Sequence, residues 1–115
     1  MNYTINEQKT VAATVDQAHA ASLKAIAGLE GKLVKQSPTM IVAKFHKTIL
    51  GKVLGDRTQL TINLSAESDG CNVQTDIYPL NAVGQKLMFG ARKGVSRTVL
   101  NWYFAHLEHH LKKSQ

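Results

Sequence analysis

The spacing of hydrophobic positions changes several times along the chain, between a period of two and a helical period, and each change predicts an element. Tyr3 to Val11 alternates most clearly at its start, which predicts a strand at the edge of a sheet. Thr14 and Gln17 then match a capping box, in which each side chain satisfies the other residue's backbone N–H, so a helix should begin here. This helix is rich in alanine, and the glycines on either side of Leu29 should end it there.

The middle of the chain predicts a series of short strands. One begins at Leu33, and Met40 to Phe45 alternates well enough to form the next. Lys47 to Gly55 suits either a helical turn or a bulged strand, and we expect a strand. Thr58 to Ala66 has the clearest pattern, because its leucines and isoleucine alternate with polar residues and predict one buried face and one solvated face.

A hairpin should follow that strand. Ser68 to Gly70 has the composition of a tight turn, and glycine supplies the positive φ that such a turn needs. Cys71 to Tyr78 alternates again and predicts the partner strand, which Pro79 should end because proline cannot donate into a continuing ladder. The next segment, Asn81 to Gly94, contains three glycines and predicts a long connection.

The last element is a long amphipathic helix over Val95 to Lys113. A helical wheel brings one set of large side chains onto one face, which must be covered: Leu100, Tyr103, Phe104, Leu107 and Leu111. The order of elements predicts an α+β fold of two layers within a single domain of residues 1–115. We expect a curved antiparallel sheet of four to six strands, in β-α-β(4-5)-α order, with the long C-terminal helix packed on the sheet.

Composition narrows the class of protein. The chain has 115 residues, of which 43% are hydrophobic and 19% charged, which is ordinary for a globular domain. Its one cysteine, Cys71, has no partner for an internal disulfide, and this fits a reducing compartment. The opening residues do not resemble a cleavable signal, and no run approaches the length of a membrane span. We therefore expect a cytoplasmic protein without membrane contact.

The net charge of +6 is unevenly distributed. No acidic residue lies between Glu30 and Asp56, a segment that contains five lysines, and a second basic cluster precedes the last helix: Lys86, Arg92, Lys93 and Arg97. Glycines and the unpaired N–H groups at a helix start would let this cluster bind an anion. Its spacing matches neither a P-loop nor a dinucleotide fingerprint, so a solvated basic loop is the simpler interpretation, and we do not expect nucleic acid to bind.

The sequence contains no set of residues that indicates an enzyme. His106 and His110 are spaced to share a metal ion, but further ligands are not adjacent, so we expect exposed histidines and no metal or other cofactor. Cys71 could meet a histidine in space, but a cysteine directly after a turn is commonplace in a purely structural role. We therefore expect a non-enzymatic protein.

Two segments carry a resemblance to a known superfamily. Lys9 to Ala18 resembles the strand and capped helix with which helix-grip proteins, the Bet v 1-like or polyketide-cyclase/START-like superfamily, begin. Val99 to Leu111 resembles the long helix that those proteins lay across their sheet. The chain is shorter than is usual for them, which argues against a roomy cavity. The order β-α-β-β-β-β-α also resembles TBP-like folds and small uncharacterised bacterial domains.

This resemblance implies a small apolar or amphipathic ligand held between the sheet and the last helix. The side chains expected to contact it are those that should face this space: Phe45, Leu60, Ile62, Val73, Val99, Trp102 and Tyr103. The alternative is an interaction module that pairs with a second copy or another partner through the flank of the helix around Trp102, or that contacts nucleic acid or another anion through its basic segments.

Overall fold

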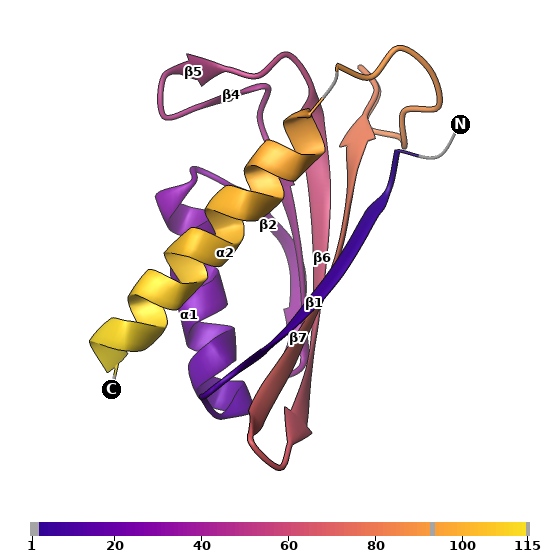
Figure 1. The fold of residues 1–115 in the computed structure, drawn as a ribbon. Coiled ribbons are helices and arrows are strands. Elements are labelled where there is room, and N and C mark those ends of the chain that lie inside the picture. The colour runs from indigo at the N-terminus through magenta and orange to yellow at the C-terminus, as the bar shows by residue number, and fades with distance from the viewer. Residues whose placement is uncertain (1–2, 93, 115) are drawn as a thin grey trace.

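The computed structural model describes residues 3–92 and 94–114 and confirms the predicted α+β architecture. The elements along the chain are β1 (Ile5–Val11), α1 (Val15–Gly28), β2 (Lys32–Ser37), β3 (Met40–Phe45), β4 (Thr48–Ile49), β5 (Lys52–Val53), β6 (Arg57–Glu67), β7 (Gly70–Leu80) and α2 (Val95–Ser114). Five strands form one antiparallel sheet in the order β1-β7-β6-β3-β2. Both helices lie on the same side of this sheet (Figure 1). Neither helix is long and apolar enough to cross a membrane.

The first two elements form where the sequence predicts them. β1 pairs only with β7 and is an edge strand. The capping box before α1 is complete, because the Gln17 backbone N–H donates to the Thr14 hydroxyl at 3.1 Å and the Thr14 N–H donates to the Gln17 side chain at 2.9 Å. α1 ends at Gly28, and Leu29 caps it with an N–H that donates to the Ala25 carbonyl at 3.1 Å.

The ambiguous stretch Lys47 to Gly55 is extended, but it does not add a strand to the main sheet. It folds into a small hairpin of β4 and β5, which pair only with each other. Leu50 and Gly51 at its tip both have positive φ, at 52° and 79°. Two successive residues with positive φ form a tight two-residue turn, whose twist matches that of the two paired strands.

The prediction that Pro79 ends the last strand is wrong, because β7 continues beyond it. Pro79 stands opposite Thr58 of β6, and its carbonyl accepts a hydrogen bond from the Leu87 N–H at 2.9 Å. The N–H and C=O of one residue point to the same side of an antiparallel strand, so the missing N–H would face Leu87 and not β6. Pairing of β1 with β7 stops at Ile5 and Ile77, so β1 does not reach Pro79, and the proline removes no bond of the five-stranded sheet.

The core lies between the sheet and the two helices. Alternate residues of β3, β6 and β7 project into it, and all five large side chains of the predicted α2 face are buried, as the helical wheel indicates. α1 contributes small residues on its buried side: Ala18, Ala21, Ser22 and Ala25. The hydroxyl groups of Ser22 and Tyr103 share a buried hydrogen bond of 2.8 Å that joins the two helices. Burial of the Tyr103 ring raises the pKa of its hydroxyl.

We predict that the Ser22–Tyr103 hydrogen bond couples the helices energetically. Tyr103→Phe should lower the free energy of unfolding by about 1–3 kcal/mol, because it leaves the Ser22 hydroxyl buried without a partner. Adding Ser22→Ala should cost less than the sum of the two single losses, by at least about 0.5 kcal/mol in denaturant unfolding. Tyr78→Phe is the control, because it removes a part-buried hydrogen bond from Gln59 within the sheet, and its loss should simply add to that of Ser22→Ala. Strictly additive losses would contradict the coupling.

Candidate functional site

The seven side chains predicted to contact a ligand all belong to the buried core or pack against it. Six of them are at most 2% exposed and belong to one buried cluster: Phe45, Leu60, Ile62, Val73, Val99 and Tyr103. They pack against one another there, and Trp102 is partly buried against the same cluster. Their role in ligand binding stays a prediction, and space for a ligand has to be sought at the margins of this core.

Trp102 lies on the flank of α2 that faces the β4–β5 hairpin. The Lys52 ammonium group of β5 is 5.7 Å from the centroid of the Trp102 ring, within range of a cation–π contact. The hairpin thus partly covers the flank that the sequence suggested for docking. A role of Trp102 in binding a second copy of the chain stays a prediction.

A hollow of about 530 Å³ opens where α2 begins, and we call it the α2 hollow. It is formed by the start of β1, the end of β7 and the segment that leads into α2. The side chains that matter for its chemistry are Tyr3, Ile5, Pro79, Ala91, Arg92 and Arg97. The hollow therefore combines apolar residues with two arginines.

The predicted basic cluster is divided by the fold. Arg92 and Arg97 both line the α2 hollow, whereas Lys86 lies apart from it, with its ammonium group 5.2 Å from the centroid of the Tyr78 ring. Lys93 lies outside the described residues. Two of the four predicted anion-binding residues are thus brought together, next to the N-terminus of a helix, where unpaired N–H groups add a partial positive charge.

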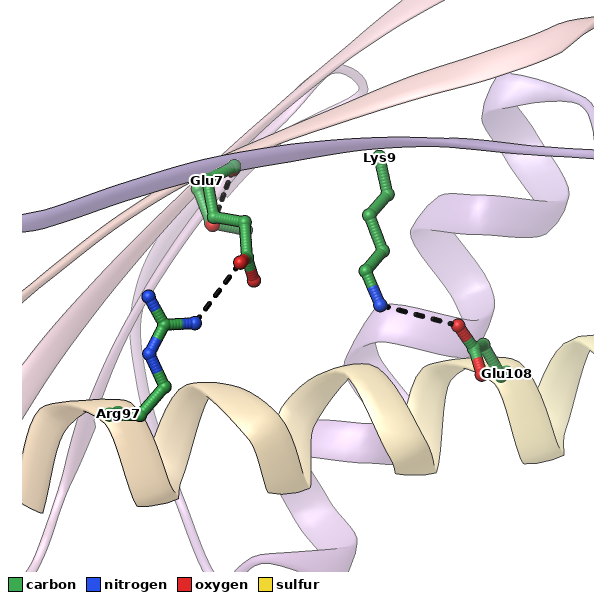
Figure 2. Close-up of polar contacts among 5 residues, drawn as sticks. Glu7, Lys9, Arg97 and Glu108 are labelled. Atoms are coloured by element: carbon green, nitrogen blue, oxygen red, sulfur yellow. Dashed lines mark hydrogen bonds and ion pairs between the residues drawn. The ribbon is translucent and has the colours of Figure 1, made fainter. Parts of the chain in front are cut away.

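Acidic residues hold the segments around the α2 hollow in place. Arg97 donates to the Glu7 carboxylate at 3.0 Å, and farther along α2 the Lys9 ammonium lies 3.6 Å from the Glu108 carboxylate (Figure 2). At the other side of the hollow, the Arg92 backbone N–H donates to the Asp56 carboxylate at 2.6 Å. The exposed ion pairs contribute little stability, but they join β1 to α2 at two points and leave Arg97 with only part of its donors in use.

Most of the residues that line the α2 hollow were not predicted from the sequence. Tyr3 precedes β1 and Ile5 begins it, but nothing in the sequence shows that these two residues line one hollow with Pro79 and Ala91, which lie far along the chain. The available signal was the basic cluster before α2, and it identified the two arginines and no apolar residue. The rest depends on long-range packing.

The histidines of α2 lie close together on the helix. The ring centroids of His106 and His110 are 6.5 Å apart, and those of His109 and His110 are 5.3 Å apart. The pKa of His110 is lowered, first by desolvation and then by the positive charges of His109 and Lys24. No group of three His, Cys, Asp or Glu side chains suited to a metal ion occurs within residues 3–92 and 94–113.

Cys71 lies in the core on the inner face of β7 and is fully buried. Burial raises the pKa of its thiol, which lowers the fraction of reactive thiolate at neutral pH. This is the opposite of what a catalytic nucleophile requires.

We predict that Cys71 is unreactive in the folded protein. Iodoacetamide at neutral pH should alkylate it at least about tenfold more slowly in the native state than in denaturant, because the reagent must wait for local or global opening. Mass spectrometry of timed samples gives both rates, with the denatured chain as the internal control. Equal rates in the two states would show that the thiol is accessible.

No protein-family model matches the sequence, and no curated protein matches it. Solved structures do match its fold. Protein CV1439 from Chromobacterium violaceum superposes with a TM-score of 0.63 at 12% identity, covering 96% of this chain and 98% of that one.

Two further solved structures extend the comparison. CalU16 from Micromonospora echinospora gives a TM-score of 0.59 at 13% identity, over 94% of this chain and 75% of that chain. Ara h 8.0201, a Bet v 1 homologue, gives 0.53 at 13% identity, over 95% of this chain and 97% of that chain. At such identities the similarity concerns the fold alone. The fold is consistent with the Bet v 1-like, helix-grip arrangement that the two ends of the sequence resemble.

Proposed function

We propose that this protein is a non-enzymatic binding domain that holds a small amphipathic molecule in the α2 hollow. The apolar part of the ligand would lie against Tyr3, Ile5 and Pro79, and its charged end would meet Arg97 and Arg92. The observation that carries the proposal is the combination of an apolar lining with two arginines in one hollow. Its volume of about 530 Å³ falls in the range of small-molecule sites.

The charges around the hollow suggest a ligand with one negative charge. Arg97 already shares its guanidinium with Glu7, and the Arg92 backbone is tied to Asp56, so carboxylates offset part of the positive charge. A single carboxylate on the ligand could use the remaining Arg97 donors without displacing Glu7. A ligand with several charges would gain less here.

The fold also supports placing the ligand in the α2 hollow. The helix-grip resemblance implies a ligand between the sheet and the last helix, and in this chain large side chains pack that space along most of α2. The α2 hollow lies at the end of the space, where β1 and β7 separate from the helix start. A ligand bound there would keep the relation to the sheet and helix that the resemblance implies, but closer to the surface.

We predict that decanoate binds more tightly than decanol. The expected difference is about tenfold, the contribution of one charge-assisted hydrogen bond to Arg97. Calorimetric titration should measure both affinities, and amide NMR shifts should map binding to residues 3–5 and 91–97. Arg97→Gln should remove the preference for the acid while leaving decanol binding unchanged.

A matched pair of variants tests the location. Ala91→Trp should fill the α2 hollow and abolish binding of both compounds, whereas Ala82→Trp, the same change in the same connecting segment, should leave binding intact. Equal affinity of the wild-type protein for decanoate and decanol would contradict the proposal that the ligand has an anionic end. No binding of either compound would contradict the proposed function as a whole.

A further inference from the structure

A second hollow, of about 330 Å³, lies at the same end of the sheet but on its outer face, and we call it the basic hollow. Its side chains come from four strands, from the short connections before β2 and after β3, and from the turn that follows β7. Those that decide its chemistry are Glu30, Lys32, Lys44, Arg57, Leu80 and Val83. None of the four residues that the sequence suggested for anion binding lines it, whereas Lys32 and Lys44 belong to the other basic segment, between Glu30 and Asp56.

Strand register places the three cations on one face. Lys32 of β2 stands directly opposite Lys44 of β3, and Lys44 stands opposite Gln59 of β6, two residues from Arg57. Residues two apart in a strand share a face, so Lys32, Lys44 and Arg57 project together. Alternation assigns them to the face opposite Phe45, whose ring is in the core. They therefore lie on the outer face, away from both helices.

The three cations have no anionic partner close by. Among residues 3–92 and 94–113, no carboxylate oxygen lies within 4.0 Å of the charged nitrogens of Lys32, Lys44 or Arg57. Glu30 also lines the hollow, but its Oε1 accepts the Leu50 N–H at 2.6 Å. Like charges directly opposite each other on paired strands destabilise the sheet. A bound anion would relieve this repulsion.

The apolar side of the basic hollow is built by an ordered turn. Asn81 accepts hydrogen bonds through its side-chain Oδ1 from the N–H groups of Val83 at 3.0 Å and Gln85 at 2.9 Å, and its own N–H donates to the Gln85 carbonyl at 2.7 Å. This turn holds Val83 beside the cations, with 78% of its surface exposed. Leu80 lies beneath, almost fully buried. The turn thus presents an apolar wall to the same space.

We infer that the basic hollow is a second binding site, for a small organic phosphate: a doubly charged group held by Lys32, Lys44 and Arg57, with a short apolar group against Val83 and Leu80. Three cations against one engaged carboxylate favour a dianion over the single charge proposed for the α2 hollow. The volume and the apolar wall favour a small molecule over a nucleic acid backbone, which would track a longer basic stripe.

Phenyl phosphate tests the inference. Titration into the full chain should shift the amide NMR signals of residues 82–84 and 44–46 saturably, and Lys44→Gln should weaken binding by about tenfold, the loss of one charge-assisted hydrogen bond. Lys35→Gln, the same change on β2 but outside the hollow, should alter the affinity by less than about twofold. Arg57→Gln provides a second variant should Lys44→Gln unfold the protein.

Four outcomes would overturn the inference. Two concern phenyl phosphate itself: no saturable shifts at residues 82–84, or an equal loss of affinity in Lys44→Gln and Lys35→Gln. The other two are binding of inorganic phosphate as tight as that of phenyl phosphate, and binding of a short DNA oligonucleotide without binding of phenyl phosphate. Ala82→Trp should block phenyl phosphate and spare decanoate, and Ala91→Trp should do the reverse. The proposals for the two hollows can therefore be confirmed or contradicted separately.

Discussion

The whole structure depends on covering the apolar face of α2, and α1 makes this possible by presenting small side chains. Ala18, Ala21, Ser22 and Ala25 are all buried, and Gly28 is so close to α2 that an added Cβ would lie 3.0 Å from a nitrogen of the His106 ring. Larger residues on α1 would hold α2 away and expose its face to water. Ser22 adds the hydroxyl partner that lets Tyr103 be buried without the cost of an unpaired polar group.

This close packing decides where free space remains. The two helices and the inner face of the sheet share one cluster of buried side chains, so side chains fill the middle of the space between them. Both hollows lie at the end of the sheet where β3 and β7 end, and both include part of the connection between β7 and α2: residues 82–84 line the basic hollow, and Ala91, Arg92 and Gly94 border the α2 hollow. One connecting segment therefore helps to form a hollow on each face of the sheet.

Local patterns predicted most of the fold, because each depends on neighbours in the sequence. The capping box at Thr14 and the alternation around Leu60 are such cases, and both formed as expected. Pro79 was misjudged because the cost of proline in a strand depends on whether a partner strand faces its missing N–H, and that is a property of the sheet edge. That Tyr3 and Ala91 line the same hollow depends on long-range packing, which no local pattern encodes.

The charged residues show most clearly that local sequence patterns do not encode long-range packing. Lys86 and Arg97 are near in sequence, but the chain turns between them, so one ammonium lies over Tyr78 and the other cation enters the α2 hollow. Lys32, Lys44 and Arg57 are scattered in sequence, yet pairing of β2, β3 and β6 sets them side by side. Electrostatic repulsion depends on distance in space, so the cations that need an anion most are those that strand register, and not sequence proximity, has brought together.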